Sequence, residues 1–302
     1  MKKMYFWEIW LPLSSGVFGH YISGAKCTVN YSLIRLFIII AIFNNYTIWA
    51  QDITGMVVNS ANEQAIEFVN IGIVGKNIGT VSDENGHFSL FIDAHLDNDS
   101  ILFSAIGYAP QWIKIADLRR NSDATIRLEE KVYEFSEVVI KPKTFKKKIL
   151  GITADIKQIA AGFHDNLLGY ECGIMIKVKK TAILKQLNIN VSSCTYDSVF
   201  YRLNIYEDRG EMGFENILKE PIYIKLLKEE VEDEIQIDLR AKNIVVSGNA
   251  LITLEHIKNL GEGHLDFCAA FGKKTYFRET SQAKWETVPV GISINVFADV
   301  EK

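Results

Sequence analysis

The chain has 302 residues, of which 48% are hydrophobic and 23% are charged, and its formal net charge is -4. This composition is ordinary for globular proteins, and the length suggests about two domains of roughly 150 residues each. The acidic balance argues against a nucleic-acid-binding protein, because phosphate contacts require a basic surface.

The first 50 residues contain one short apolar run, LIRLFIIIAIF at residues 33–43. A run of this length falls well short of the ~20 residues that a transmembrane helix needs. It matches the hydrophobic region of a secretory signal peptide with cleavage after Ala50. We therefore expect residues 1–50 to be a leader, the mature chain to be exported, and no transmembrane span to remain in it. Two alternatives stay open: translation that begins near Leu33, and an uncleaved amphipathic anchor.

Short strand-like segments follow from residue 52 to residue 140. Turn residues separate them, most clearly at Asn85-Gly86, which supplies the positive φ of a hairpin turn. Asp83 and Glu84 beside it also suggest a calcium loop, but adjacent carboxylates point apart, so we expect a plain turn. The expected strands are 53–58, 68–74, 79–81, 87–92, 100–105, 111–115, 124–128 and 138–140. Short strands at this spacing are typical of a β-sandwich.

This region resembles the carboxypeptidase-D regulatory-like domain that is common in exported Bacteroidota proteins. The matching segments are ITG at 53–55, FVNI at 68–71, GTVSDENG at 79–86, FSL at 88–90, ILFS at 101–104 and IGY at 106–108. The resemblance implies a seven-stranded transthyretin-like or Ig-like β-sandwich over residues 52–140 and a protein of a Gram-negative cell envelope. It does not imply peptidase activity, because the family is named after a non-catalytic domain that stands beside a peptidase.

Domains of this family often stand at the amino end of TonB-dependent outer-membrane transporters. The residues after 140 are too few for a plug and a barrel of about 22 strands with roughly 10 residues in each strand. An accessory protein of such a transporter remains one alternative function.

Residues 141–148, KPKTFKKK, are strongly basic and contain a proline. We interpret residues 141–164 as a solvated linker, because like charges extend a chain. An alternative is that the lysines bind anionic lipid. The apolar spacing after Gly151 is near-helical, which predicts a short helix in this linker.

The alternating pattern of strands returns from residue 165 to residue 302. The expected strands are 171–177, 183–191, 198–206, 222–226, 234–239, 249–254, 265–271 and 291–297. Eight or more strands in this length predict a second antiparallel sandwich of the jelly-roll type. The region is similar to second domains of the same exported proteins, but no function comes with that similarity.

Catalytic and metal-binding motifs are missing from the sequence. It contains no GxSxG, HExxH, P-loop or GxGxxG motif and no CxxC pair. His256 and His264 flank a glycine-containing loop but lack further ligands, and Asp93, Asp97 and Asp99 are interpreted as a solvated loop. We therefore predict no metal, no cofactor and no enzymatic activity. We expect Cys172, Cys194 and Cys268 to be buried thiols. One disulfide between two of them is the alternative.

Aromatic residues in the second domain give the most suggestive binding pattern. We single out Trp285, Tyr276 and Tyr201 as candidates for a flat, sugar-binding platform, with packing in the core as the alternative. The sequence thus predicts an all-β protein of the periplasm or outer membrane. Its expected role is non-catalytic binding or scaffolding of a protein or glycan partner, with a carbohydrate-binding module as an alternative.

Overall fold

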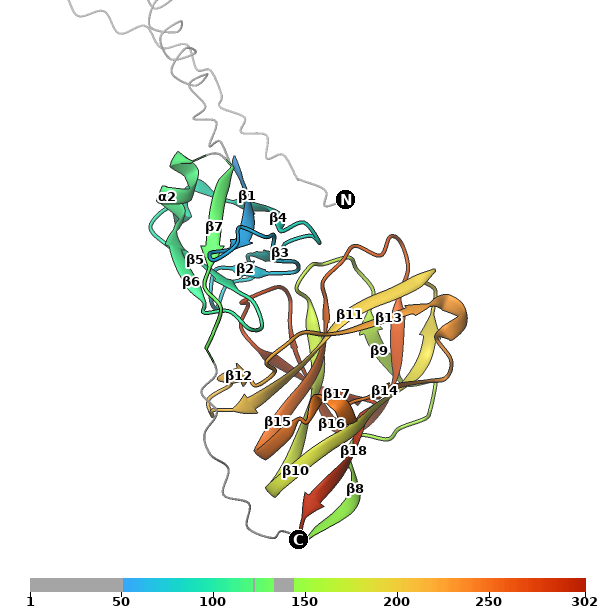
Figure 1. Cartoon of the computed structure of the whole chain (residues 1–302). Coiled ribbons are helices and arrows are strands. Elements are labelled where there is room, and N and C mark those ends of the chain that lie inside the picture. The colour runs from blue at the N-terminus through green and yellow to red at the C-terminus, as the bar shows by residue number, and fades with distance from the viewer. Residues whose placement is uncertain (1–50, 122, 133–143) are drawn as a thin grey trace, which may run out of the picture. The chain divides into compact units, whose positions relative to one another are not determined.

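The computed structural model of the protein describes residues 51–121, 123–132 and 144–302 (Figure 1). We call residues 51–132 the first part and residues 144–302 the second part. The described residues form strands joined by short helices and loops, which confirms the all-β fold class. The leader and the strand expected at 138–140 lie outside the described residues. Within the described residues, no helix has both the length and the apolar character to cross a membrane.

The first part forms two small β-sheets that share one core. Their strand orders are β4-β1-β7 and β3-β2-β5-β6. The strands alternate as the sequence predicts: in β4, Phe88, Leu90 and Ile92 are buried and the residues between them are exposed. The elements are β1 (Gln51–Asn59), β2 (Asn70–Gly72), β3 (Gly79–Val81), β4 (His87–Ile92), η1 (Ala94–Leu96), β5 (Ser100–Ser104), β6 (Gln111–Lys114), α2 (Ile115–Arg120) and β7 (Ala124–Leu128).

The predicted turn before β4 is present. The carboxylate of Asp83 accepts hydrogen bonds from the backbone N–H groups of Asn85 and His87, at 2.9 and 2.8 Å. Gly86 has a φ of 76°, a conformation that glycine adopts without strain. The carboxylate of Asp83 therefore acts as a turn-forming group that organises its own backbone.

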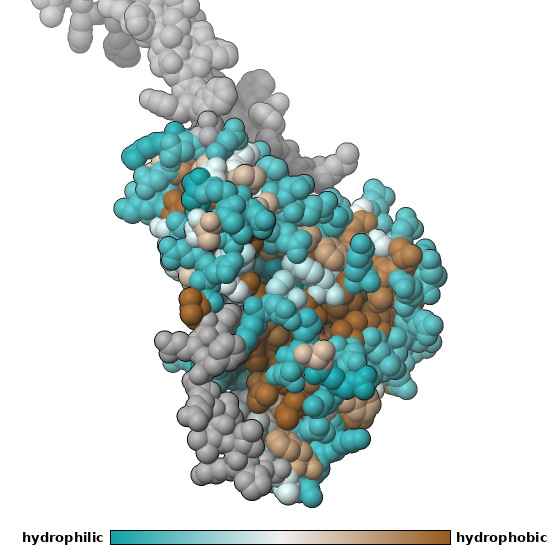
Figure 2. All heavy atoms as spheres, viewed as in Figure 1, coloured by the Kyte–Doolittle hydropathy of each residue, from teal (hydrophilic) through white to brown (hydrophobic). Residues whose placement is uncertain are grey.

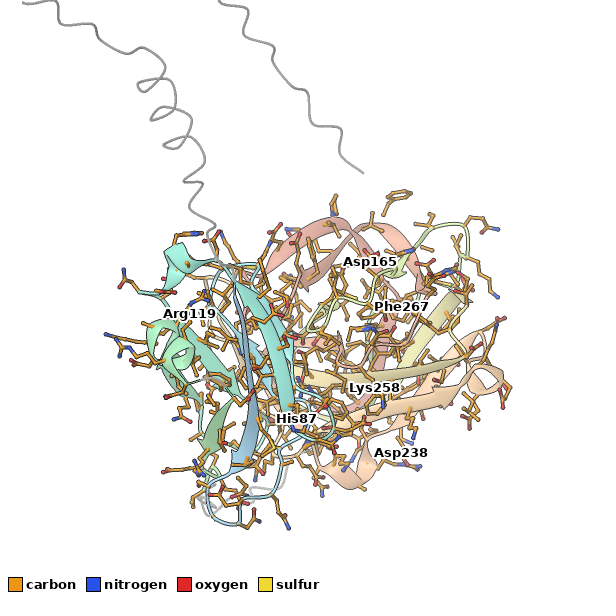
Figure 3. The ribbon with its side chains drawn as sticks, turned by 90° about the horizontal axis from the view of Figure 1, so that it is seen from above. His87, Arg119, Asp165, Asp238, Lys258 and Phe267 are labelled. Atoms are coloured by element: carbon orange, nitrogen blue, oxygen red, sulfur yellow. The ribbon has the colours of Figure 1, made fainter. Side chains whose placement is uncertain are left out.

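The second part is one hydrogen-bonded sheet of eleven strands, with the central order β12-β11-β15-β10-β16-β17. Both halves of the long strand β10 contribute side chains to one core, so the sheet wraps around that core. Phe267 of β16 lies inside it, whereas Asp238 points outward (Figure 3). The elements are β8 (Phe145–Gly151), β9 (Ala160–Phe163), β10 (Glu171–Cys194), β11 (Ser198–Asp208), β12 (Phe214–Asn216), β13 (Ile222–Leu227), η2 (Lys228–Glu230), β14 (Glu234–Asp238), η3 (Arg240–Lys242), β15 (Val245–His256), β16 (Leu265–Arg278), β17 (Glu286–Ile292) and β18 (Ile294–Glu301).

The segment interpreted as a linker with a short helix has a different structure. β8 pairs with β18, and β9 pairs with β16, so the second part begins before residue 165. Leu150 and Ile152 pack against the core, which gives this basic stretch an apolar reason to join the sheet. The helical prediction is wrong because pairing with a distant strand overrides weak local spacing. The lysines of β8 suit its position at a sheet edge, where charge opposes pairing with other chains.

Two glycines that face each other on β2 and β3 let the second part approach closely. Gly72 is paired with Gly79 in the sheet register. A Cβ at either position would lie well inside the contact distance of the Ser281 carbonyl oxygen. The same loop is fixed by a hydrogen bond from Gly75 N–H to the Gln282 carbonyl, at 2.9 Å. The contact therefore requires glycine, which has no Cβ, at both positions.

A Gly79→Ala substitution should test this contact. We expect it to lower the free energy of unfolding by about 1–3 kcal/mol, the range for inserting a methyl group into a packed contact. Urea unfolding measures the change. Thr80→Ala, on the same strand but with its side chain on the opposite face, is the control and should change stability little. Equal stability of Gly79→Ala and wild type would contradict the tight packing of residue 281 on this sheet.

Candidate functional site

Four buried charged residues lie side by side across four neighbouring strands. In the sheet register Arg202 of β11 is paired with Glu255 of β15, Glu255 with Glu171 of β10, and Glu171 with Arg278 of β16. We call these four residues the charge row. All four are buried, and both glutamates are 0% exposed. Moving a charged group out of water costs free energy, so buried charges need ion pairs and hydrogen bonds inside the protein.

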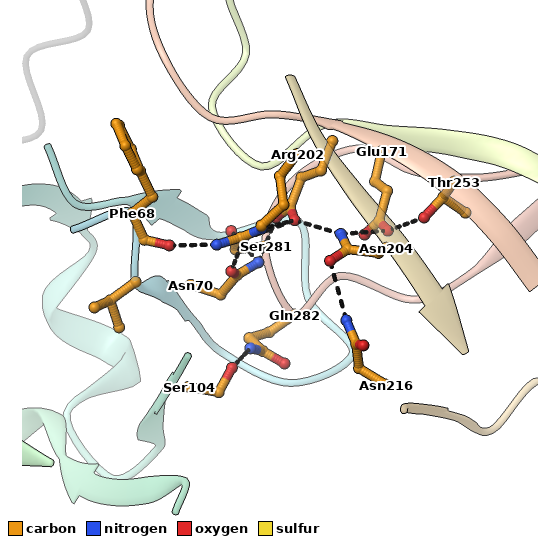
Figure 4. A network of polar contacts seen from close by, with 12 residues as sticks. Phe68, Asn70, Ser104, Glu171, Arg202, Asn204, Asn216, Thr253, Ser281 and Gln282 are labelled. Carbon is orange, nitrogen blue, oxygen red and sulfur yellow. Dashed lines mark hydrogen bonds and ion pairs between the residues drawn. The ribbon is translucent and has the colours of Figure 1, made fainter. Parts of the chain in front are cut away.

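The charge row lies on the sheet face opposite the core of the second part. Neighbouring residues such as Leu203, Leu254 and Cys172 point to the other face and belong to the core. The period of two in each strand therefore separates an apolar face from a polar one. The polar face carries the row and the residues that hydrogen-bond to it. Figure 4 shows Arg202 and Glu171 of the row with several of these partners.

Arg202 and Glu255 form the first half of the row. The Nε and Nη2 atoms of Arg202 donate to one carboxylate oxygen of Glu255 at 3.1 and 2.7 Å. Asn204 donates to the same oxygen at 2.7 Å, and Asn70 donates to the other. Both oxygens of Glu255 are therefore occupied by fixed donors.

Glu171 and Arg278 form the second half. Arg278 donates to Glu171 through Nε at 2.8 Å and Nη2 at 2.6 Å. Asn204 donates at 3.0 Å, the Tyr206 hydroxyl donates at 2.9 Å, and the Thr253 hydroxyl adds a further bond. Asn204 thus bridges the two carboxylates through one amide group.

The two carboxylates have pKa values that move in opposite directions. Burial raises the pKa of Glu171, against the opposing charge of Arg278. Burial also acts to raise the pKa of Glu255, but the guanidinium groups of Arg202 and Arg278 outweigh it and hold that pKa below its usual value. Glu255 therefore stays ionised as the common partner of both arginines.

The charge row also binds the first part of the chain. Arg202 Nη1 donates to the carbonyl oxygen of Phe68 at 2.6 Å, and Nη2 donates to the side-chain oxygen of Asn70. Asn70 is on β2 and also donates to the Ser281 hydroxyl at 3.3 Å. Arg202 therefore connects Glu255 directly to a strand of the first part. Figure 4 shows Arg202 beside Phe68 and Asn70.

An apolar cluster and a polar loop reinforce this connection. Phe68 packs edge-on against Phe200 and Tyr223, with ring centroids 5.3 and 5.5 Å apart. The Gln282 side chain donates to the Ser104 hydroxyl at 2.8 Å. Burial of apolar rings beside a satisfied polar network is the arrangement of a stable internal interface.

A cleft of about 350 Å³ opens beside the charge row. We call it the junction cleft. Its volume falls within the range of small-ligand pockets, about 300–1,000 Å³. Its lining combines the row with amide, hydroxyl and aromatic side chains: Asn70, Ser104, Ala105, Ile106, Gly107, Tyr108, Pro110, Lys131, Arg202, Asn204, Tyr206, Phe214, Glu215, Asn216, Leu218, Glu255, Arg278 and Gln282.

The aromatic candidates do not form an open platform. Trp285 is 9% exposed, and the Cζ atom of Arg278 lies 5.0 Å from its ring centroid. Trp285 and Tyr276 both pack against Phe214, with ring centroids 5.4 and 6.1 Å apart. Tyr201 lies apart from them in the core, 1% exposed and 4.4 Å from Phe163 between ring centroids. The expected platform is wrong because these rings fill space behind and beside the charge row.

The two histidines that flank the glycine-containing loop lie in different surroundings. His256 is 0% exposed and packs beside Tyr201, whereas His264 stacks on His164 at the surface. His164 pairs with Asp266 at 2.9 Å. Among the described residues, no group of three or more His, Cys, Asp or Glu side chains is arranged to hold a metal ion. Cys172, Cys194 and Cys268 are free thiols, and burial raises the pKa of Cys172.

Sequence reasoning missed the charge row. Arg202 lies in the run FYRLNIY and Glu255 in the run LITLEHI, both of which read as strands. A single charged residue inside such a run was the available signal, because buried charges need partners. The identity of the partners depends on strand register, which no local pattern contains.

On the second part, more hydrophobic residues reach the surface than on the first. Figure 2 shows hydrophilic residues over most of the first part on the face drawn and larger hydrophobic areas over the second. Phe271 and Ile149 are among its exposed apolar side chains, at 73% and 52%. Scattered apolar residues of this kind are normal on protein surfaces.

Comparison with known proteins gives one family match. The family model described as CarboxypepD_reg-like domain matches residues 53–140. No curated protein matches the chain. Solved structures with some likeness include a form of BcpA, the major pilin subunit of Bacillus cereus, with 11% identity and a TM-score of 0.16 over 80% of this chain and 69% of that chain.

Two viral structures show a similar level of likeness. They are infectious bursal disease virus Gt strain and the VP2 subviral particle of infectious bursal disease virus, each with 8% identity over 83% of this chain and 64% of that chain. Their TM-scores are 0.20 and 0.19, too low to carry an argument about fold or function. The family match, in contrast, agrees with the two small sheets of the first part. Residues 53–140 are therefore a CarboxypepD_reg-like domain.

Proposed function

We propose that this chain is a non-catalytic binding or scaffolding protein of the bacterial cell envelope. In this proposal the CarboxypepD_reg-like domain and the second part act as one unit, and the junction cleft receives the partner. The observation that carries the proposal is the charge row. Its four charges are engaged within the chain and with the first part, which suits a rigid support for a neighbouring cleft.

A hydrolase is the second candidate, because two carboxylates with divergent pKa values stand next to each other. Two features favour the structural role. Glu171 does not line the cleft and is fully buried. Glu255 lines it, but its two oxygens already accept bonds from Arg202, Asn204 and Asn70. A general acid or base needs an atom within hydrogen-bond reach of substrate.

Export to the envelope is supported by the apolar run at residues 33–43 and by the family context of residues 53–140. The full chain expressed in its native host and fractionated should appear in the periplasm or with the outer membrane. A chain that retains residues 1–50 and stays in the cytosolic fraction would contradict the envelope role.

Activity screens separate the two candidates. We expect the full chain to show no turnover of glycoside, ester or peptide substrates above the level of buffer. The Glu255→Gln variant is the control, because it removes the only row carboxylate that lines the cleft. Turnover by wild type would replace the binding role with a hydrolase, and its loss in a Glu255→Gln variant that keeps the native circular-dichroism spectrum would assign Glu255 to the reaction.

A further inference from the structure

The junction cleft has unused hydrogen-bond donors. Arg278 lines it, and within the described residues its Nη1 atom has no hydrogen-bond partner, since Glu171 and Tyr206 are reached by Nε and Nη2. The amide of Asn216 uses one N–H on Asn204. Each amide nitrogen has two N–H groups, so Asn216 has one left for a ligand.

A second pair of side chains adds further donors to the lining. Gln282 uses one amide N–H on the Ser104 hydroxyl. The hydroxyl accepts that bond, so its own proton remains available, as does the second amide N–H of Gln282. Four donors from Arg278, Asn216, Ser104 and Gln282 thus line one cleft. Such a cleft favours a ligand rich in acceptor atoms.

The charges of the lining also favour an anionic ligand. Three cationic side chains, Lys131, Arg202 and Arg278, line the cleft together with two anionic ones, Glu215 and Glu255. Glu215 is itself paired with Arg209 at 2.6 Å, outside the lining. Glu255 is held by Arg202 at 2.7 Å. Arg202 donates through all three of its guanidinium nitrogens within the chain, whereas Nη1 of Arg278 has no hydrogen-bond partner among the described residues. A guanidinium also matches the geometry of a carboxylate.

We propose that the junction cleft binds a carboxylate group of a small ligand, with Arg278 as its cationic partner. Asn216, Ser104 and Gln282 supply hydrogen bonds around it, and Tyr108 and Phe214 supply apolar contact. This inference rests on the proposed binding role and specifies the chemistry of the ligand. The volume of about 350 Å³ limits the occupant to the size of one or two sugar units or amino-acid residues.

Two ligand pairs that differ at the carboxylate test the inference by calorimetric titration of the full chain. Glucuronate and glucose represent an acidic and a neutral sugar. Alanyl-alanine and its carboxy-terminal amide represent a free and a blocked peptide end. We expect the carboxylate member of at least one pair to bind about tenfold or more tightly than its neutral counterpart. The pair that shows this difference identifies the source of the carboxylate.

A negative charge added to the lining of the cleft provides the matched variant. Gln282→Glu keeps the size of the side chain and can accept a bond from Ser104, but it adds a negative charge. It should weaken the carboxylate ligand by about tenfold or more through like-charge repulsion. Gln64→Glu makes the same charge change at an exposed residue outside the lining and should leave binding unchanged. Ser104→Ala removes one donor and should weaken binding without adding charge.

The outcomes separate this inference from the proposed function. Equal binding of both members of each pair, or no binding of either carboxylate at millimolar concentration, overturns the carboxylate site. If Gln64→Glu weakens binding as much as Gln282→Glu, the site lies elsewhere and the inference is also wrong. None of these results bears on the fractionation and activity screens, which decide the envelope role by themselves.

Discussion

Arg202→Met should lower the free energy of unfolding by about 3–5 kcal/mol, because it leaves the buried carboxylate of Glu255 without its closest cation. The side chains of Arg202 and Glu255 are 4% and 1% exposed, so water cannot replace the lost partner. The substitution also removes the bonds to Phe68 and Asn70 in the first part. Urea unfolding followed by circular dichroism measures the change.

A double-mutant cycle isolates the ion pair from these other contacts. Arg202→Met combined with Glu255→Gln should be more stable than the sum of the two single losses predicts, because no buried charge is then left unpaired. Arg240→Met is the matched control: it breaks an exposed pair with Asp238 and should leave the unfolding midpoint nearly unchanged. Additive losses in the cycle would mean that the charge row contributes no coupling.

Acid should destabilise the protein through His256 between about pH 6.5 and about pH 4. Burial lowers the pKa of His256 from 6.5 to about 4, against a smaller opposing effect of the backbone at Lys258. In this range the unfolded chain binds a proton that the folded chain does not bind. The free energy of unfolding therefore falls as the pH falls, by up to about 3 kcal/mol, and this loss ends below the folded pKa.

Comparison with His256→Phe isolates this contribution. The ring of Phe163 lies 6.0 Å from that of His256 and the ring of Tyr201 lies 5.5 Å away, so an aromatic replacement suits the site. The variant should lose less stability than wild type between neutral and acid pH. His87→Gln, at an exposed histidine, should follow the wild-type profile. Parallel profiles for wild type and His256→Phe would show that His256 does not titrate as its burial requires.

Local features of the fold were predictable from the sequence because they depend on neighbouring residues. The turn at Asp83 and Gly86 is set by one carboxylate and one glycine within four residues. The alternation of β4 is a property of six consecutive residues. Both carried the resemblance to the CarboxypepD_reg-like domain, and the family match supports it.

Features that depend on distant pairing were not predictable. β10 was expected as two strands, at 171–177 and 183–191, but pairing with β15 continues across a register shift between Lys177 and Thr181. The charge row needs the register of β10, β11, β15 and β16 at once. A one-residue slip of any strand would move its charged member to the apolar face.

The positions of side chains at the candidate site were also not predictable from the sequence. Trp285 was a candidate for an open platform, but Arg278 covers its ring and Tyr206 packs against it at 5.8 Å between centroids. Gln282 and Ser104, which are 178 residues apart, meet only when the first part contacts the second. Their chemistry was visible in the sequence, whereas their proximity was not.

We infer that the charge row unites the CarboxypepD_reg-like domain and the second part into one cooperative unit. Trp112 on β6 and Trp285 report on the two parts separately, and fluorotryptophan labelling of the full chain gives each a fluorine NMR signal that Trp→Phe substitution assigns. Both signals should lose their native state at the same urea concentration in wild type, as a two-state unit requires. Separate midpoints for Trp112 and Trp285 in wild type would show that the two parts unfold independently and are not one cooperative unit.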